Sequence, residues 1–503
     1  MSKQIKNIVI VGGGTAGWIT AGTLAASLIK KVAGGYSITL VESASIPIIG
    51  VGEGTWPTMR NTLKNMGIKE TDFIRRCHVS FKQGAKFSQW VTGKSDDFYY
   101  HPLVLPQGFD QINLTPHWQS LANQQSFSKT VCPQEAICEL GLAPKLITTP
   151  EYQAQANYAY HLDAGTFSEF LKEHCTTTLN IQHIVDDVVQ INSSKTGDIA
   201  SVTTASNGDI SGDLFIDCTG FKSLLLGEHY KVPFVSCEDV LFTNQAIAVQ
   251  VPYEHEDSPI QSHTLSTAQS AGWVWDIGLT TRRGVGYVYS NNYTSEDLAH
   301  QELLNYLSST VREPEKLSFR NIPIKSGYRE RFWEKNCVAI GLSSGFLEPL
   351  ESTSIFLIQI AITKLIEFFP NKDFHQAAIT QYNQTMSHHY IQIRNFIILH
   401  YHATQRNDSD FWHYCREMSI PDELQHLLSL FKEGGRVDRT QFGIWPAVCI
   451  GQGVIPEQYD ARIDNLPYDK IQQYMNNYRM QVQHAVNTLP SIDNYLRQVM
   501  KSI

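Results

Sequence analysis

Three glycines near the start of the chain have the spacing of a turn that binds a dinucleotide. Gly12, Gly14 and Gly17 fit the pattern G-x-G-x-x-G, after an apolar run at residues 8–11 and before a helix-like segment. Such glycines permit a tight turn and let backbone N–H groups approach a pyrophosphate at the positive end of the helix. Glu42 ends the next apolar run and can accept hydrogen bonds from a ribose. The spacing fits NAD and FAD equally, and without a second good copy of the pattern, the electrons for a bound FAD would come from another source.

Two further kinds of ionisable side chain could take part in catalysis. Lys82 precedes Lys86 by four residues, and this spacing alone favours a solvated helix face. Burial of a lysine would instead favour the neutral amine, which is the nucleophilic form. Glu351 could act as a general base, although a glutamate at a helix start also stabilises the helix dipole. Glu348 lies close by and carries the same carboxyl group, but we do not assign it a catalytic role.

A pair of tryptophans has the period of a β-strand. Trp273, Trp275 and Ile277 alternate with Val274 and Asp276, so the first three would share one face of the strand. That face could be ordinary sheet core or a dry wall beside a bound ligand. The periodicity does not separate the two interpretations.

Two other patterns suggest chemistry but lack a supporting context. Gly341, Ser343 and Gly345 fit G-x-S-x-G, as in the nucleophile turn of a hydrolase. Pro349 follows too soon for the required helix, because proline disfavours the helical conformation of the preceding residue. Five histidines lie between residues 388 and 413, but they do not form a His-Glu-x-x-His pattern, and we predict no metal site.

The elements that would position these residues indicate an α/β fold. Residues 5–11, 18–31 and 38–42 read as a strand, a helix and a strand, and a further helix is predicted from Pro57 to Gly67. We divide the chain into a dinucleotide-binding module in three parts (1–90, 158–237 and 331–370), an insertion or lid (91–157), an antiparallel sheet region (238–330) and a helical region (371–503).

Composition excludes several classes of protein. The 503 residues include 40 Lys and Arg against 49 Asp and Glu, and the absence of a basic run argues against nucleic acid as a partner. The nine cysteines are odd in number and contain no Cys-x-x-Cys pair, which argues against a disulfide framework or a structural zinc. We find neither a signal peptide nor an 18-residue apolar run, so we expect a cytoplasmic protein outside the membrane.

Six longer strings, in order along the chain, carry a family resemblance. They are GVGEGT at 50–55, FK at 81–82, YAYHLD at 158–163, DCTGF at 217–221, GWVWDI at 272–277 and FLEPLEST at 346–353. On these strings the chain resembles the flavin-dependent halogenases of the tryptophan halogenase family.

The resemblance implies a fold and a reaction. The fold would be a Rossmann-like FAD-binding module with a second antiparallel sheet, similar to flavin monooxygenases, and a mainly helical C-terminal substrate region. In such enzymes reduced FAD and dioxygen oxidise chloride or bromide to hypohalous acid, which the lysine matched by Lys82 directs to an electron-rich aromatic, here an indole or a tryptophan-like compound. The glutamate matched by Glu351 lies near that lysine and accepts a proton. An aromatic monooxygenase and a FAD-binding protein without catalysis are the alternatives, and retention of both residues favours the halogenase.

The resemblance also assigns the other site residues. The expected cofactor-binding residues are Gly12, Gly14, Thr15, Ala16, Gly17, Glu42, Gly50, Val51, Gly52, Glu53, Gly341 and Leu347. The expected halide site comprises Thr353 and Ser354, and the expected tunnel wall comprises Trp273, Trp275 and Ile277. Many characterised members have Gly in place of Ser354 and Pro in place of Gly278, which leaves the halide preference and the shape of the tunnel wall open.

The expected partners are a small aromatic substrate and a separate NAD(P)H-dependent flavin reductase, and a homodimer is left open. Enzymes that act on free tryptophan hold it with a C-terminal clamp for which we find no match, so a smaller indole or a carrier-bound aromatic is equally admitted. Candidates for the pocket wall are His101, Phe109, Trp412, Phe442 and Trp445.

Overall fold

The computed structural model describes residues 4–28, 35–46, 52–106, 114–119, 125–435, 445–459 and 467–501. The chain divides into two compact units, each assembled from three stretches of sequence. Unit 1 comprises Met1–His78, Leu162–Asp239 and Lys325–Ile393. Unit 2 comprises Val79–His161, Val240–Ile324 and Arg394–Ile503.

Unit 1 is built on a six-stranded sheet. Its strands, in spatial order, are β20 (Trp333–Glu334), β21 (Cys337–Ala339), β12 (Leu214–Asp217), β1 (Asn7–Val11), β2 (Ser37–Glu42) and β8 (Gln182–Val185). All neighbours pair in parallel except β20, which is antiparallel to β21. The predicted strand–helix–strand unit at the N-terminus is therefore confirmed.

Continuous apolar runs in β1 and β2 are buried along most of their length, so both faces of this sheet are covered. Val9 and Val11 of β1 share a buried cluster with Ile199 and Val202 of a smaller antiparallel sheet. That smaller sheet comprises β9 (Val188–Ser193), β10 (Ile199–Thr204) and β11 (Gly208–Ser211). A third group of short strands in unit 1 comprises β13 (Phe234–Ser236), β19 (Gly327–Arg329) and β22 (Gly345–Phe346).

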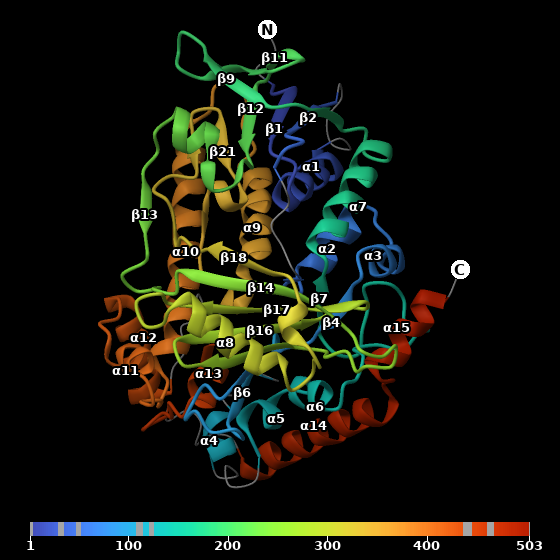
Figure 1. Cartoon of the computed structure of the whole chain (residues 1–503), viewed down its shortest axis with the longest axis vertical. Helices are drawn as coiled ribbons and strands as arrows, with labels where there is room; N and C mark the ends of the chain where they lie inside the picture. Colours follow the sequence, from blue (N-terminus) through green and yellow to red (C-terminus); the bar gives the residue numbers. More distant parts are fainter. Residues whose placement is uncertain are drawn as a thin grey trace. The chain divides into compact units, whose positions relative to one another are not determined.

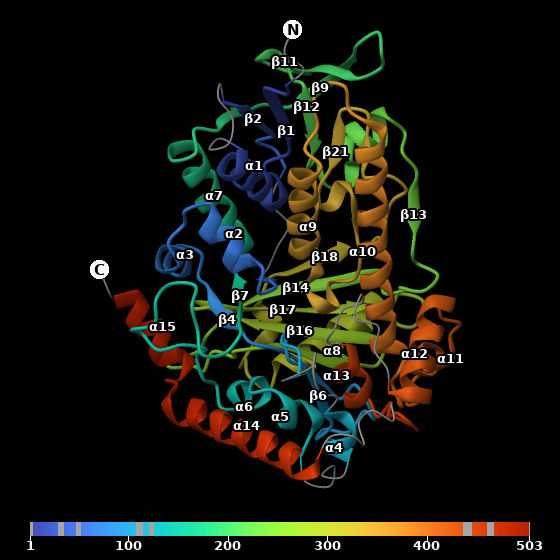
Figure 2. The same ribbon diagram turned by 180° about the vertical axis from the view of Figure 1, so that it is seen from behind.

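Helices complete unit 1. They are α1 (Thr15–Leu28), α2 (Met59–Asn65), α3 (Glu70–Arg76), α7 (Ala164–Thr177), α9 (Thr353–Glu367) and the first part of α10 (Gln376–His402). α9 and α10 run side by side in both views of the chain (Figures 1 and 2), and the Tyr382 hydroxyl of α10 donates to the Ala361 carbonyl oxygen of α9 at 3.3 Å. The helix predicted from Pro57 begins at Met59, since residues 56–58 form a turn first.

Unit 2 is built on a seven-stranded sheet. Its strands, in spatial order, are β18 (Phe319–Pro323), β14 (Gln245–Pro252), β17 (Arg282–Tyr289), β16 (Gly272–Gly278), β15 (Thr264–Gln269), β5 (Ala85–Ser88) and β6 (Phe98–His101). Every neighbouring pair is antiparallel except β15 and β5. A parallel sheet in one unit and a largely antiparallel sheet in the other confirm the predicted fold class.

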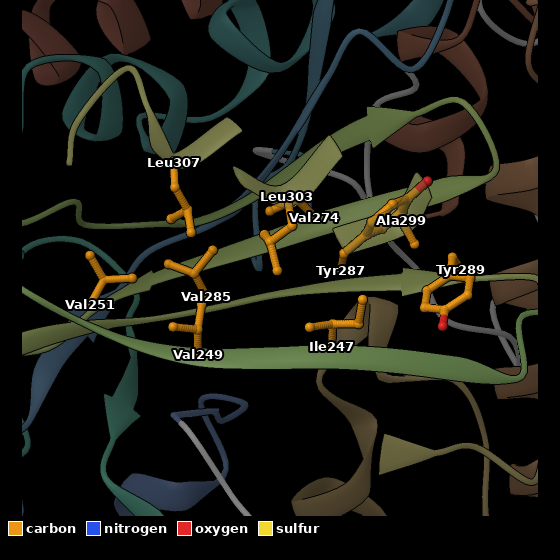
Figure 3. Close-up of a cluster of buried hydrophobic side chains, with 10 residues drawn as sticks. All are labelled: Ile247, Val249, Val251, Val274, Val285, Tyr287, Tyr289, Ala299, Leu303 and Leu307. Atoms are coloured by element: carbon orange, nitrogen blue, oxygen red, sulfur yellow. The ribbon is translucent and has the colours of Figure 1, made fainter. Parts of the chain in front are cut away.

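One face of the seven-stranded sheet is covered by helix α8 (Glu296–Leu307). Ala299, Leu303 and Leu307 recur every four residues, so they lie on one side of the helix, facing the sheet (Figure 3). They join a buried cluster whose strand members are Ile247, Val249, Val251, Val274, Val285, Tyr287 and Tyr289.

The remaining elements of unit 2 are mostly helical. They are β4 (Ser80–Lys82), β7 (Ala159–Leu162), α4 (Thr115–Gln119), α5 (Phe127–Val131), α6 (Gln134–Glu139), α11 (Asp410–Glu417), α12 (Asp422–Gly434), α13 (Trp445–Gly451), α14 (Tyr468–Thr488) and α15 (Ile492–Lys501). Residues 91–157, predicted as an insertion or lid, contain β6 and, in their described part, the short helices α4, α5 and α6. Within the described ranges, no helix is long and apolar enough to cross a membrane.

The packing of α8 predicts a graded effect of substitution. Leu303→Ala should lower the free energy of unfolding by about 2–5 kcal/mol, because the fully buried side chain leaves a cavity between helix and sheet. Leu298→Ala, on the same helix, is the matched control: Leu298 is 61% exposed, and its loss should cost about 0.5 kcal/mol or less. Denaturant unfolding midpoints measure both, and equal losses would contradict the assigned packing.

Candidate active site

The glycine turn of unit 1 joins β1 to α1 with little room to spare. Gly12 has a φ of 113°, and a Cβ atom there would lie 2.2 Å from the Cys218 carbonyl oxygen. A Cβ atom on Gly17 would lie 1.9 Å from the Gly12 carbonyl oxygen. A Cβ atom on Gly14 would meet nothing within 4 Å. The turn therefore packs tightly at two glycines and is open at Gly14, beside the start of α1, where the residues fit a bound pyrophosphate.

Glu42 lies at the end of β2, next to this turn. A Cβ atom on Gly13 would lie 2.3 Å from the Glu42 carboxyl carbon. Glu42 Oε2 is 2.8 Å from Nε2 of His183, whose ring meets the edge of Trp18 at 5.0 Å. The glycine spacing did not reveal His183, because only the parallel pairing of β8 with β2 brings it to this position.

The turn after β12 explains the DCTGF string. Asp217 is fully buried, and its carboxylate accepts hydrogen bonds from the backbone N–H groups of Thr219, Leu225 and Leu226 at 3.0, 2.9 and 2.8 Å. The Thr219 hydroxyl also donates to it at 2.6 Å. A buried carboxylate satisfied in this way stabilises the turn that faces the glycine loop.

The GLSSG segment is a packing turn rather than a nucleophile turn. Gly341 has a φ of 78°, and a Cβ atom there would lie 2.6 Å from Cβ of Ala16 in α1. Ser343 is 1% exposed, and its hydroxyl donates to the carbonyl oxygens of Ile340, at 3.0 Å, and Asp217. A hydroxyl engaged with backbone oxygens inside the protein is not a hydrolase nucleophile. Leu347, just beyond, is 2% exposed.

The structure describes the GVGEGT string from Gly52 onward. Gly50 and Val51, two of the expected cofactor residues, lie outside the described residues. Glu53 begins the short strand β3 (Glu53–Gly54) and is half-buried. Burial raises the pKa of its carboxyl group to about 7. This carboxyl group therefore changes charge in the physiological range.

Glu351 lies directly before helix α9. Its residue is 1% exposed, in the short helix Pro349–Glu351, and Ser352 with a φ of 54° turns the chain into α9. The Trp56 indole N–H donates to the Glu351 carbonyl oxygen at 2.9 Å, and its ring stacks on Phe356 at 4.9 Å. These contacts hold the backbone of Glu351 in place.

The predicted halide residues occupy the first turn of α9. Thr353 is 2% exposed, and Ser354 is half-buried. α9 has 15 residues, so its first turn presents unbonded N–H groups and the positive end of a helix dipole. This arrangement suits a small anion.

Lys82 belongs to a strand of unit 2, so the helix-face interpretation of Lys82 and Lys86 is wrong. Lys82 ends β4, opposite Ala159 of β7, and is 1% exposed. Lys86 lies in the next strand, β5, where its Nζ atom is 2.6 Å from Glu139 Oε1. The two lysines therefore lie on separate strands and do not share a helix face. Long-range strand pairing, not local spacing, decides the conformation of this segment.

The twin tryptophans lie on β16 with the predicted alternation. Trp273 and Ile277 are 1% and 4% exposed, and Trp275 is half-buried between them. Asp276 points to the other face, where Tyr306 donates to its carboxylate at 3.1 Å. We call the side of β16 that carries Trp273, Trp275 and Ile277 its bulky face. Gly286 of β17 makes room for this face, because a Cβ atom there would lie 2.1 Å from the Trp275 ring.

The candidate pocket aromatics of unit 2 lie in packed surroundings. His101 is fully buried with its ring against Phe396 at 5.5 Å, and Trp445 packs on Phe431 at 5.3 Å. Trp412 is fully buried, and its indole N–H donates to the Gln269 carbonyl oxygen at 2.6 Å. Phe109 and Phe442 lie outside the described residues.

Among the histidines of α10 and α11, His400 has ordinary structural partners. His400 Nδ1 is 2.7 Å from the Tyr99 hydroxyl, and its ring stacks on Phe87 at 4.6 Å. Over the part of the chain that the structure describes, no group of three or more His, Cys, Asp or Glu side chains could hold a metal ion. All nine cysteines are free and buried.

The predicted site residues are divided between the units. Unit 1 contains the described cofactor residues, Glu351, Thr353 and Ser354. Unit 2 contains Lys82 and the three residues of the bulky β16 face.

Comparison with known proteins finds similarity along almost the whole chain. The sequence model of the family described as tryptophan halogenase matches residues 7–468. The structure of a tryptophan halogenase from Shewanella frigidimarina is 43% identical, with a TM-score of 0.94, covering 99% of this chain and 98% of that one. A flavin-dependent halogenase from Xanthomonas campestris is 33% identical, with a TM-score of 0.87 and 99% of each chain covered. The tryptophan 6-halogenase SttH of Streptomyces toxytricini is 33% identical over 526 residues, covering 98% of each chain.

Similarity to these structures over at least 98% of each chain defines the class of the protein as the flavin-dependent halogenases. The family match spans most of the sequence, and the relatives exceed 30% identity over nearly their whole length. The chain belongs to the tryptophan halogenase family.

The half-buried Glu53 carboxyl group predicts a pH-dependent stability. The folded pKa of about 7 lies above the ordinary 4.5, so the contribution of Glu53 is fully present below pH 4.5 and is lost as the pH rises through 7. Glu53→Gln removes the charge, and should therefore stabilise the flavin-free protein at pH 8 by about 1 kcal/mol, or about 1 °C in Tm, with a smaller effect at pH 5.5.

Thermal unfolding at the two pH values measures this difference. Glu228→Gln, at an exposed position of unit 1, is the control and should give the same small change at both. A Glu53→Gln effect that is equal at pH 5.5 and pH 8 would show that the carboxyl group does not titrate in this range.

Proposed function

We propose that this protein transfers chlorine or bromine to an indole or another electron-rich aromatic ring, using reduced FAD, dioxygen and the halide. The observation that carries the proposal is Lys82, a lysine 1% exposed on a strand of a chain that belongs to a halogenase family. Two relatives are named as tryptophan 6- and 7-halogenases, which supports an indole ring as the substrate.

The glycine turn of unit 1 would hold the cofactor. Gly12, Gly14 and Gly17, with Thr15 and Ala16 between them, would receive the pyrophosphate at the positive end of α1. Reduced FAD, when bound, supplies with dioxygen the oxidising power that converts the halide to hypohalous acid.

Other cofactor contacts would come from around this turn. Glu42 would accept hydrogen bonds from the ribose, and Gly341 packs against Ala16 closely enough to border the same cradle. The further residues assigned to cofactor binding are Gly50, Val51, Gly52, Glu53 and Leu347.

The first turn of α9 would hold the halide. The N–H groups of Thr353 and Ser354 lie at the positive end of a 15-residue helix, which favours an anion. A halide ion has no shape of its own, so its site needs only directed N–H groups and low competition from water.

Lys82 would control the hypohalous acid. Its amine either donates a hydrogen bond to the acid or exchanges a proton for the halogen, which gives a haloamine and releases water. Hypohalous acid reacts with many groups, so selectivity depends on holding the halogen close to one carbon of the ring. Trp273, Trp275 and Ile277 would supply an apolar wall along its path that excludes water.

Glu351 would act as the general base. Addition of the halogen makes the ring a cation with an extra proton on the halogenated carbon, and a buried carboxylate both stabilises that charge and accepts the proton. The Trp56 contact to its backbone would keep the carboxylate in a constant position.

A separate NAD(P)H-dependent flavin reductase would supply the reduced FAD. The sequence contains one good dinucleotide turn, which the flavin would occupy. The purified protein should therefore bind FAD by itself. NADH should be oxidised only when a reductase is added.

Mass spectrometry tests the reaction. Indole and tryptophan are incubated with FAD, reductase and NADH, in parallel with bromide, with chloride and with neither. A halide-dependent mass gain with the matching isotope pattern supports the halogenase and ranks the halides. A gain of one oxygen in every reaction would overturn it in favour of a monooxygenase.

Lys82→Ala should lower the rate of halogenation in this assay by at least about 100-fold. Reduced FAD should still be oxidised, because the amine acts after the halide has been oxidised. Lys86→Ala is the matched control and should retain halogenation, since its amine pairs with Glu139 in the neighbouring strand. Halogenation at the wild-type rate in Lys82→Ala would remove this residue from the mechanism.

Glu351→Gln should slow halogenation by about 10²–10⁴-fold with the fold intact, since the amide keeps the shape of the side chain but cannot accept a proton. Glu348→Gln is the control for the loss of a buried carboxyl group in the same segment. Single-turnover rates measure both variants, and equal rates for the two would refute the assignment of the base to Glu351.

A further inference from the structure

A buried histidine outside the expected site residues lies next to the strand of Lys82. His161 of β7 is fully buried and pairs with Ser80 of β4. Its Nε2 atom is 2.8 Å from the Thr264 hydroxyl oxygen, and its Nδ1 atom is 3.4 Å from the Ser80 hydroxyl oxygen. The Ser80 hydroxyl donates to the carbonyl oxygen of Gly278. The imidazole on β7 thus bonds to β4 and β15, and the Ser80 hydroxyl bonds β4 to β16.

The hydrogen-bond partners assign the tautomer of His161. The single proton of the Ser80 hydroxyl goes to Gly278, so Ser80 can only accept from the imidazole, and Nδ1 must carry a hydrogen. In a neutral ring Nε2 is then the acceptor, and the Thr264 hydroxyl donates to it. Every hydrogen bond of the network then has one donor and one acceptor.

The network is adjacent to Lys82 through the strand. Ser80 and Lys82 are two residues apart, so their side chains lie on the same side of β4, and His161 lies diagonally opposite Lys82 across the β4–β7 pair. Ala159, directly opposite Lys82, has no polar group to orient the amine. The next residue, Gln83, is held by a 2.7 Å hydrogen bond from its backbone N–H to the Ser262 carbonyl oxygen.

Electrostatics keep the imidazole neutral. Burial lowers the pKa of His161 well below its ordinary 6.5, and a positive charge on Lys82 lowers it further. A neutral ring adds no second positive charge beside the amine.

We propose that His161 is a positioning residue for Lys82: its neutral Nδ1–H tautomer, held by Thr264 and Ser80, fixes the strand that presents the amine. The proposal rests on the proposed function, in which Lys82 controls the hypohalous acid. The same network ends on the backbone of Gly278, directly after the bulky face of β16, so one set of hydrogen bonds ties the lysine strand to the tryptophan strand.

Thr264 offers the cleanest way to test the network. Thr264→Val removes the hydroxyl donor but keeps the shape of the side chain, and Thr264→Ser restores the donor. Ser290→Ala is the matched control, because Ser290 is a fully buried hydroxyl residue of unit 2 that lies outside the network. All are assayed as full-length enzyme with FAD, reductase, halide and indole.

Loss of the donor should lower kcat for halogenation and spare substrate binding. In Thr264→Val we expect kcat to fall about 10- to 100-fold and KM for the aromatic to change less than about 2-fold, while reduced FAD is still oxidised. Thr264→Ser should recover to within about 3-fold of wild type, and Ser290→Ala should match wild type. Unchanged kcat in Thr264→Val, or an equal loss in Ser290→Ala, would overturn the proposal.

The tautomer provides a readout independent of activity. Proteins labelled with ¹⁵N in histidine are compared with His161→Gln, which identifies the His161 signals by their loss. We expect a protonated Nδ1 and an unprotonated Nε2 at neutral pH in the wild type and in Thr264→Ser. A protonated Nε2 in the wild type would overturn the proposal even if Thr264→Val failed to fold.

Lys82→Ala separates this inference from the proposed function. If Lys82→Ala still halogenates, the assigned role of the lysine fails. If Lys82→Ala is inactive while Thr264→Val is fully active, only the positioning role of His161 fails. The two results are distinct.

Discussion

Holding an amine away from water is the constraint that the lysine segment of unit 2 has to satisfy. Lys82 is 1% exposed, and a buried ammonium group costs several kcal/mol unless neighbouring groups compensate or it loses its charge. The short strand β4 that carries this lysine is fixed by its backbone pairing with β7, by the Ser80 hydroxyl on Gly278 and by Gln83 on Ser262. A lysine on a flexible loop could not remain buried in one orientation, because the backbone carrying it would move.

Unit 1 satisfies a different constraint, the close approach of backbone to backbone. Gly12, Gly17 and Gly341 each stand where a Cβ atom would collide with the neighbouring turn or with α1. Through these contacts the glycine turn, the DCTGF turn and the segment before α9 pack together at the carboxyl ends of β1 and β12. Ligands bind at this edge in parallel sheets. The open space at Gly14 is the exception in this tight packing, and it is where a phosphate would fit.

A halogenase has to restrain a small and unselective reagent, and the structure suggests how rigidity serves that purpose. In the proposed mechanism the chemical groups are few: an amine, a carboxylate and the N–H groups of a helix start. Each is attached to backbone that is fixed by buried hydrogen bonds, as with Trp56 on the Glu351 carbonyl oxygen. Positional precision of this kind supplies selectivity that the reagent lacks.

The sequence alone determined the family, the α/β class, the glycine turn and the alternation of β16, because these are encoded in contiguous strings and local periods. Local spacing alone misassigned the Lys82–Lys86 segment to a helix face, because pairing of β4 with β7 and of β5 with β15 produces two strands there. It also gave no sign of the His161 network, whose members Ser80, His161, Thr264 and Gly278 are up to 198 residues apart. Only the tertiary structure decided those features, because hydrogen bonds between distant strands depend on how the whole chain packs.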